Sequence, residues 1–335
     1  MHLKVPRALG EEIRNKLACE GVLDRSRKIK TENGFIYIPI TKKVSIKGTE
    51  IVEIESETQE NKKKSLSDAL KDKLSSAELE YVPRAFDVIG DIAVLEIPDE
   101  IISKKKIIGE ALLKTFKNIK VVTNKTTSVG TEYRTREMEV VAGEKRTETL
   151  HKEHGCVYKL DVTTAYFSPR LGSERLRVAE KVKEGERVLV MFAGIGPYPV
   201  LIAKKMKPSE VVAIELNPSG VKYMEENIKL NKVKVKAILG DAGEEVKKLG
   251  QFDRIVMPLP KDAGNFLEAT IPALKKGGTI HYYTFTRTTH EAADEAKKIC
   301  ENLGHKIEIL KSVECGTYSP CLSRMCVDFK VLENK

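Results

Sequence analysis

The chain has 335 residues, of which 41% are hydrophobic and 32% charged, and it carries a formal net charge of +9. This composition excludes a disordered or collagen-like chain and suffices for two or three domains with buried cores. The positive excess suits a polyanionic partner such as nucleic acid, although it would also serve solubility alone. No apolar run reaches the ~18 residues that a membrane span needs, and no secretory signal opens the chain. We therefore expect a cytoplasmic protein without membrane contact.

Residues 1–58 are predicted to form a small N-terminal α+β module. Apolar residues at helical spacing over 11–21 precede strand-like runs at 35–40 and 51–55. The module is near the lower size limit for independent folding. A polar run at 56–65 has no apolar periodicity and predicts a linker to the rest of the chain.

Residues 59–150 are predicted to form a middle α+β domain. We expect helices at 66–79 and 101–116, and strands at 87–98, 119–123 and 134–142. The first of these strands is expected to carry a turn or bulge at Gly90 and Asp91.

Residues 151–335 are predicted to form a doubly wound α/β domain. A strand at 156–162 is followed, from residue 188 onward, by apolar strands that alternate with amphipathic helices. This alternation favours a mostly parallel, Rossmann-like sheet that helices cover on both faces. The last elements are a helix over 291–302 and a closing strand around 325–332.

Ligands of such open sheets bind beyond the carboxyl ends of the strands. The first strand ends in FAGIGPYP (192–199), where Gly194 and Gly196 permit a sharp turn and a close backbone approach. The dinucleotide-binding pattern has a third small residue where this chain has Pro199. The proline counts against a nicotinamide cofactor.

The next three strand ends complete a pattern typical of an S-adenosylmethionine site. Glu215 lies 19 residues after Gly196, where a carboxylate can accept both hydrogen bonds of a ribose diol. Asp241 could accept an adenine amino group, and the proline-framed loop MPLPK lies where the reacting group should be. The predicted cofactor-binding residues are Phe192, Gly194, Gly196, Glu215, Leu216, Asp241, Ala242 and Pro258.

The order of these motifs resembles that of class I methyltransferases, and other segments narrow the resemblance. YRTREMEVVAGEKRTETLHKEHG (133–155), YFSPRLGSER (166–175), MFAGIGP, IELNP, LPK and HYYTF are similar to the archaeal and eukaryotic tRNA (guanine(37)-N1)-methyltransferase family. The resemblance covers most of residues 65–335. It implies a monomeric enzyme that transfers a methyl group from S-adenosylmethionine to N1 of guanosine 37. Residues 1–58 match the family's tRNA-binding domain in size and position, which implies contact with the tRNA elbow while the anticodon loop occupies the active site.

The resemblance also implies roles for individual residues. Methylation of N1 requires a base for its proton and a donor for the negative charge that shifts to O6. In the family pattern these roles fall on Glu174 and Arg134; without the resemblance, they read as a helix N-terminal carboxylate and a surface ion pair. The other implied contacts are with guanine at Tyr166, Arg170, Pro258 and Pro260, and with the cofactor at Arg175. We expect the four strand-end loops to converge on one crevice, with Glu174 and Arg134 at its mouth.

Two residues depart from the family pattern. Val190 stands where better-known members have an aspartate, and Pro258 stands where they have an asparagine that reads the guanine edge. These departures leave a non-catalytic RNA-binding protein as one alternative. A bifunctional enzyme that also methylates a tricyclic wyosine precursor is a second, and a nicotinamide-dependent oxidoreductase is a third.

A metal site is not expected. His151 and His154 lie in HKEHG, but no cysteine or second histidine pair completes a ligand set. His281 is interpreted as a packed core histidine beside Tyr282 and Tyr283.

Overall fold

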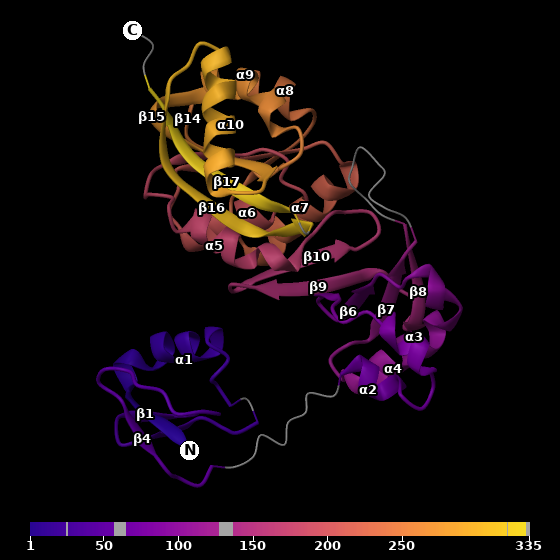
Figure 1. Ribbon diagram of the computed structural model, residues 1–335. Coiled ribbons are helices and arrows are strands. Elements are labelled where there is room, and N and C mark those ends of the chain that lie inside the picture. The colour runs from indigo at the N-terminus through magenta and orange to yellow at the C-terminus, as the bar shows by residue number, and fades with distance from the viewer. Residues whose placement is uncertain (25, 57–64, 127–136, 320, 333–335) are drawn as a thin grey trace. The chain divides into compact units, whose positions relative to one another are not determined.

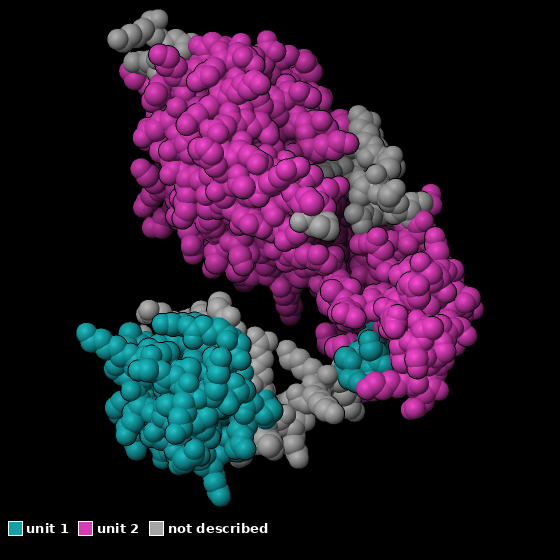
Figure 2. Space-filling model, in the orientation of Figure 1, with its two compact units in different colours: residues 1–69 teal, residues 70–335 magenta. Residues whose placement is uncertain are grey.

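The computed structural model describes residues 1–24, 26–56, 65–126, 137–319 and 321–332 (Figure 1). Arg134 lies outside these ranges, and so does most of the predicted linker at 56–65. The chain divides into two compact units, residues 1–69 and 70–335, which Figure 2 colours separately. Residues 70–150 of the predicted middle domain lie in the second unit, together with the predicted C-terminal domain.

The first unit is built on a four-stranded sheet in the order β2-β3-β1-β4. β1 pairs antiparallel with β3 on one side and β4 on the other, and its Leu3 and Val5 pack with Leu17 of α1 in a fully buried core. The sequence patterns predicted α1, β3 and β4 but missed β1 and β2. The elements are β1 (His2–Pro6), η1 (Arg7–Leu9), α1 (Gly10–Cys19), β2 (Lys30–Glu32), β3 (Phe35–Pro39) and β4 (Glu50–Val52).

The second unit begins with a four-stranded sheet in the order β5-β6-β7-β8. The predicted helix at 66–79 is wrong, because Ser75 forms a capping box with Glu78 and starts a second helix there. The predicted strand at 87–98 is a hairpin that turns at Gly90, whose φ is 59°. α2 (Leu66–Leu70) spans the boundary between the two units. The other elements are α3 (Ser76–Glu80), β5 (Asp87–Ile89), β6 (Ile92–Leu95), η2 (Asp99–Lys104), α4 (Lys105–Thr115), β7 (Val121–Lys125) and β8 (Met138–Gly143).

An antiparallel hairpin of β9 (Glu148–Glu153) and β10 (Cys156–Asp161) joins this sheet to the large one. On one side the backbone N of Gly90 donates to His151 Nδ1 over 3.1 Å. On the other side Asn227 and Asn231 of α7 hydrogen-bond with the β10 backbone at distances from 2.6 to 3.1 Å. The domain boundary predicted after residue 150 falls inside β9.

The large sheet has the order β13-β12-β11-β14-β15-β17-β16. The first five strands are parallel, and β17 runs antiparallel to both of its neighbours. The doubly wound prediction is confirmed for the parallel part, whereas β16 was missed. The strands are β11 (Arg187–Val190), β12 (Glu210–Glu215), β13 (Lys236–Leu239), β14 (Phe252–Met257), β15 (Leu274–Thr286), β16 (Ile307–Ser319) and β17 (Leu322–Val331).

Helices cover both faces of this sheet, and alternate strand residues point to opposite sides. Val188 and Val190 of β11 pack with α5, α6 and α7, while Leu189 and Met191 pack with α8, α9 and α10. The helices are η3 (Pro169–Leu171), α5 (Gly172–Ala179), α6 (Pro197–Lys205), α7 (Pro218–Asn231), α8 (Ala242–Glu245), η4 (Val246–Lys248), η5 (Ala263–Phe266), α9 (Leu267–Thr270), η6 (Ile271–Ala273) and α10 (Thr289–Asn302). Among the helices in the described ranges, none has the length and apolar character that crossing a membrane requires.

Candidate active site

The loops after β11, β12, β13 and β14 open at one edge of the large sheet. Val190 at the end of β11 pairs with Ala213 of β12 and Val256 of β14. Glu215 at the end of β12 pairs with Leu239 of β13. The structure therefore brings the four predicted strand ends together, as the parallel order requires.

The loop after β11 folds back on itself through three left-handed residues. Phe192, Gly194 and Gly196 have φ values of 53°, 57° and 86°. A Cβ built on Gly194 would lie 3.5 Å from the carbonyl oxygen of Tyr166. The glycine turn thus passes directly beside the start of the YFSPRLGSER segment, so that the predicted cofactor and substrate residues adjoin.

Glu215 holds the glycine turn in place. Its Oε2 accepts from the backbone N of Gly194 over 2.7 Å, and its Oε1 accepts from the backbone N of Asn217 over 2.8 Å. Burial raises the pKa of Glu215, and these backbone hydrogen bonds lower it in part. Each oxygen retains a second lone pair, so the carboxylate can still accept from a ribose hydroxyl.

Asn217 is a site residue that the sequence analysis missed. Its Oδ1 accepts from the backbone N of Ser219 over 2.9 Å and caps α7, and its Nδ2 donates to the carbonyl of Thr164 over 2.8 Å. An Asn-Pro pair before a helix signals the cap. No sequence signal reveals the bond to Thr164, because the two residues are far apart in the chain.

Asp241 follows β13, at the third of the four strand ends. Its Oδ1 accepts from the backbone N of Glu244 over 3.1 Å and caps α8, and the residue is exposed. The preceding Gly240 donates its N–H to the carbonyl of Glu215 over 3.0 Å, which links the second and third strand ends. The Phe192 ring meets Phe266 edge-on at 4.8 Å between ring centres. Leu216 and Pro258 are half-buried, and Ala242 and Pro260 are buried.

The strand-end loops fit an adenosyl group on the chemistry of their residues. The turn at Gly194 leaves room for a close approach, Glu215 offers acceptors to a diol, and Asp241 offers a carboxylate at the third strand end. The aromatic pair of Phe192 and Phe266 adds apolar surface next to these acceptors.

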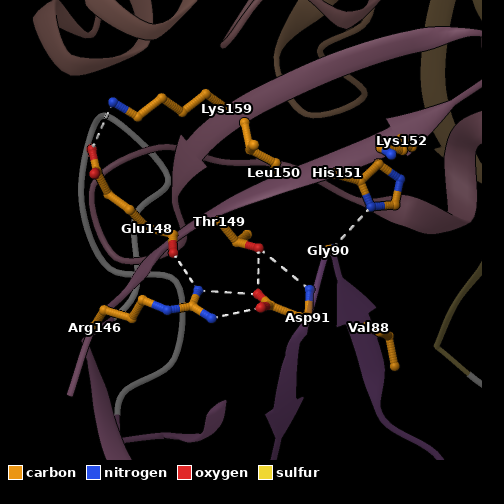
Figure 3. A pocket seen from close by; sticks show the side chains of 10 residues that line it. All are labelled: Val88, Gly90, Asp91, Arg146, Glu148, Thr149, Leu150, His151, Lys152 and Lys159. Carbon is orange, nitrogen blue, oxygen red and sulfur yellow. Dashed lines mark hydrogen bonds and ion pairs between the residues drawn. The ribbon is translucent and has the colours of Figure 1, made fainter. Parts of the chain in front are cut away.

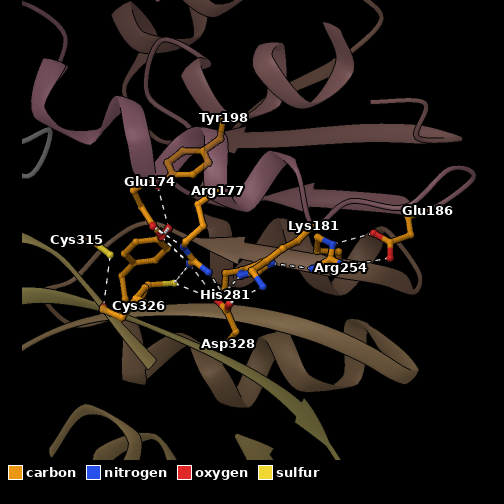
Figure 4. A network of polar contacts seen from close by, with 12 residues as sticks. Glu174, Arg177, Lys181, Glu186, Tyr198, Arg254, His281, Cys315, Cys326 and Asp328 are labelled. Atoms are coloured by element: carbon orange, nitrogen blue, oxygen red, sulfur yellow. Dashed lines mark hydrogen bonds and ion pairs between the residues drawn. The ribbon is translucent and has the colours of Figure 1, made fainter. Parts of the chain in front are cut away.

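Glu174 does not stand open at the mouth of the crevice, and that expectation is wrong. Its side chain is only 6% exposed. Figure 4 shows the polar contacts around it. Oε1 accepts from the Tyr283 hydroxyl over 2.6 Å, and Arg177 donates to both carboxylate oxygens over 2.6 and 2.8 Å. Tyr283 in turn lies 2.9 Å from the hydroxyl of Tyr198. These donors turn Glu174 inward, toward the sheet.

The Glu174 contacts continue into a buried polar network. Arg177 also donates to Asp328 over 2.6 Å, and Asp328 accepts from Nδ1 of His281 over 2.5 Å. Arg254 lies 2.8 Å from Nε2 of His281. Because a guanidinium only donates, Nε2 accepts and the ring proton sits on Nδ1.

This arrangement fixes the charge of the buried groups. Burial lowers the pKa of His281 and outweighs the opposing effect of Asp328. Burial alone would raise the pKa of Asp328, but the hydrogen bond from His281 and the charge of Arg177 bring it well below its usual range. His281, Cys326 and Asp328 form a cluster of metal-binding residue types within the described ranges. In this tautomer, however, His281 has no lone pair left for an ion.

The other residues predicted from YFSPRLGSER take different positions. Arg175 is buried and forms a bidentate ion pair with Glu153, and it also donates to the carbonyl of Ser168 over 3.0 Å. These bonds stabilise the YFSPRLGSER segment. They differ from the contact with the cofactor that was expected of Arg175. Arg170 is largely exposed and donates to Asp87 over 2.6 Å, and Tyr166 is 38% exposed.

A separate cavity of about 670 Å³ lies beside the β9–β10 hairpin (Figure 3). Two ion pairs lie among the side chains that line it: Arg146 donates to Asp91 over 3.0 Å, and Lys159 lies 3.6 Å from Glu148. None of the predicted site residues lines this cavity.

Comparison with known proteins gives three matches to family profiles. The TRM5/TYW2 methyltransferase domain matches residues 149–310, the TYW2 N-terminal domain matches 66–147, and the tRNA methyltransferase 5 N-terminal domain matches 3–47. A tRNA (guanine(37)-N(1))-methyltransferase, Trm5b of Pyrococcus abyssi, is 42% identical over 334 residues, which cover 98% of each chain. This chain belongs to the TRM5/TYW2 methyltransferase family.

Other relatives and solved structures of this family extend the comparison. The crystal structure of the Pyrococcus abyssi protein superposes with a TM-score of 0.72 at 41% identity over 98% of both chains. The structure of aTrm5 in complex with tRNALeu superposes with a TM-score of 0.71 at 33% identity over 99% of this chain and 100% of that one. A Nanoarchaeum equitans tRNA (guanine(37)-N(1))/4-demethylwyosine(37)-methyltransferase, Taw22, is 35% identical over 64% of this chain and 86% of its own.

Membership of the TRM5/TYW2 family confirms the class I methyltransferase fold expected from the sequence. Nothing in the comparisons supports a nicotinamide-dependent oxidoreductase. The roles assigned to individual residues stay predictions, and Arg134 lies outside the described residues.

Proposed function

We propose that this enzyme transfers a methyl group from S-adenosylmethionine to N1 of guanosine 37 in tRNA, on the 3′ side of the anticodon. The observation that carries the proposal is the glycine turn, in which Gly194 is hydrogen-bonded to Glu215 and adjoins Tyr166. S-adenosylmethionine supplies an electrophilic methyl group. Gly194, Glu215 and Asp241 hold its adenosyl part, and Tyr166 and Arg170 contact the guanine.

Glu174 serves as the general base for the N1 proton. In the structure its carboxylate is engaged with Tyr283 and Arg177, so it must exchange one of these donors for the N1–H of guanine. The Tyr283 bond is the one that the site can give up, because Tyr283 keeps Tyr198 as a partner at 2.9 Å. Arg177 then retains the other carboxylate oxygen and fixes the direction of the base.

The remaining predicted residues complete the site. Arg134 is proposed to donate to O6 as negative charge develops there. Pro258 is half-buried and stands against the guanine, and buried Pro260 shapes the loop behind it. Arg175 supports Ser168 and so positions the substrate segment.

The chain is proposed to act as a monomer in the cytoplasm. The unit formed by residues 1–69 would contact the tRNA elbow while the anticodon loop enters the crevice. The net charge of +9 supports binding to the phosphate backbone.

A second candidate function is methylation of a tricyclic wyosine precursor at the same nucleotide. Pro258 offers no side-chain amide to read the guanine edge, which relaxes the hydrogen-bond selection for guanine over another base. The dual-function name of the Nanoarchaeum equitans relative supports this possibility.

Mass spectrometry of tRNA nucleosides after incubation with enzyme and methyl donor tests both functions. Transcripts with guanosine at position 37 should gain 1-methylguanosine, and those with another base should not. Transfer-RNA that carries the wyosine precursor tests the second function.

Glu174→Gln should lower single-turnover methylation by about 10²- to 10⁴-fold, the usual share of a general base. Affinity for S-adenosylhomocysteine should stay near that of the wild type, and Glu210→Gln, which alters only an ion pair with Arg187, is the control. Undiminished methylation by Glu174→Gln would remove Glu174 from the base role.

A further inference from the structure

Three cross-strand pairs lie in a row on one face of β15 and β17. Residues directly opposite each other in an antiparallel ladder point to the same face, and so do residues two apart along a strand. The pairs are His281 with Asp328, Tyr283 with Cys326, and Phe285 with Arg324. The first two pairs contact Arg177 and Glu174, as described above. The third continues the row outward to Tyr166, whose hydroxyl lies 3.4 Å from Nη2 of Arg324.

Arg324 is the member of this row that has a buried donor without a partner. Its Nε is buried and has no hydrogen-bond partner, and the bond to Tyr166 is long. No carboxylate of the described residues forms an ion pair with it. By contrast, three other arginines of the domain are each bound to a carboxylate: Arg175, Arg177 and Arg254. A buried donor without a partner is costly in a folded protein. Because the guanidinium is also charged and pairs with no carboxylate of the described residues, an anionic acceptor suits it best.

Aromatic rings flank this guanidinium. The Arg324 guanidinium lies 5.7 Å from the centre of the Phe285 ring, and Tyr318 of β16 packs on Phe285 with ring centres 4.2 Å apart and planes inclined by 32°. Tyr318 is nevertheless 64% exposed, more than any other exposed large hydrophobic side chain in the described part of the chain. Its free face is a surface on which a planar base can stack.

We propose that Arg324, Phe285 and Tyr318 form a subsite for the nucleotide next to the methylated guanosine. Arg324 donates to the phosphate of that nucleotide, and its base stacks on Tyr318. The proposal rests on the proposed function and extends its substrate site by one nucleotide. A base that enters a catalytic pocket must leave its stack, which deprives its neighbour of a stacking partner. The aromatic pair replaces that partner immediately beyond Tyr166.

The test measures binding of a fluorescent anticodon stem-loop RNA to the full-length protein by anisotropy. Tyr318→Ala should weaken binding by about 5- to 150-fold, the usual loss for one stacked base, and Tyr318→Phe should bind like the wild type. Arg324→Gln should weaken binding and lower the salt dependence by about one released ion. Leu310→Ala is the matched control, since Leu310 is an exposed side chain of the same strand, at 45% exposure.

A second arm separates stacking from a general loss of structure. RNA that lacks the base at the neighbouring position should bind the wild type as weakly as complete RNA binds Tyr318→Ala. Tyr318→Ala should bind this RNA no more weakly than it binds the complete RNA. At saturating RNA, Tyr318→Ala should recover most of the single-turnover rate, because Tyr318 affects binding more than chemistry.

Each outcome decides the question. If Tyr318→Ala and Arg324→Gln both bind like Leu310→Ala, the subsite does not exist, whether or not the wild type methylates the RNA. If binding depends on Tyr318 but no guanosine is methylated, the subsite stands and the proposed function fails. Absence of measurable binding by the wild type overturns both.

Discussion

The network behind Glu174 makes a quantitative prediction about Arg177. Its guanidinium donates to Glu174, which is 6% exposed, and to Asp328, which is 2% exposed. Arg177→Met would leave both carboxylates buried without this cation. Glu174 would keep the Tyr283 hydroxyl, and Asp328 would keep His281 and the more distant Lys181 at 3.7 Å.

Removing one partner of a buried ion pair lowers the free energy of unfolding by about 3–5 kcal/mol. Arg177 pairs with two carboxylates, but each keeps another donor, so the loss is not doubled. We therefore expect Arg177→Met to lower the free energy of unfolding by about 3–5 kcal/mol. The chain has no tryptophan, so urea unfolding is followed by far-ultraviolet circular dichroism. Lys207→Met is the control, because the Lys207–Glu184 pair spans 3.8 Å between largely exposed side chains and should contribute nothing measurable.

A double-mutant cycle tests the cause. Glu174→Gln removes the charge that Arg177 neutralises, so the double variant should lose less stability than the sum of the single variants, by about 0.5–3 kcal/mol. The reasoning is refuted if Arg177→Met unfolds within about 1 kcal/mol of the Lys207→Met control, which would mean that water reaches both carboxylates.

Three further predictions concern the crevice, the buried histidine and the first unit. Gly196→Ala should abolish measurable S-adenosylhomocysteine binding by calorimetry, since its Cβ would lie 2.8 Å from Met224 Cγ at a φ of 86°; retained affinity would contradict the turn geometry. The pKa of His281 is lower in the folded state than in the unfolded state, where it is about 6.5. The neutral ring therefore contributes to the free energy of unfolding above pH 6.5, and this contribution is lost as the pH falls below 6.5. The wild type should thus lose up to about 1.4 kcal/mol per pH unit from this group between pH 6.5 and 5, and His281→Asn should lack that slope in urea unfolding. Deleting residues 1–55 should weaken tRNA binding in a gel-shift assay while the rest of the chain stays folded, and aggregation of the truncated chain would argue against a separable unit.

The sequence patterns predicted the parallel part of the large sheet because its strands are continuous apolar runs that alternate with helices. They missed β9 because its inward positions include Thr149 and His151, which carry no apolar signal. They also missed β1, a strand of five residues that contains Lys4 and ends in Pro6. For β1, pairing with the distant strands β3 and β4 outweighs local propensity.

The candidate site was predictable where it depends on local turns and not where it depends on distant partners. Gly194 and Glu215 lie at strand ends, whose positions follow from the strand–helix alternation. The inward turn of Glu174 depends on Tyr283, which lies 109 positions away in the chain. No spacing rule connects them, so the resemblance to a family could suggest the role of Glu174 but not its environment.

The side-chain amide of Asn217 places a limit on redesign of the cofactor loop. Its Oδ1 caps the start of α7, and its Nδ2 donates a hydrogen bond to the carbonyl of Thr164, two residues before Tyr166. Aspartate would preserve the helix start but would set an oxygen against the Thr164 carbonyl, where two acceptors repel. A library that randomises this loop to change cofactor preference would therefore also displace the nucleobase side of the crevice, unless position 217 is held constant.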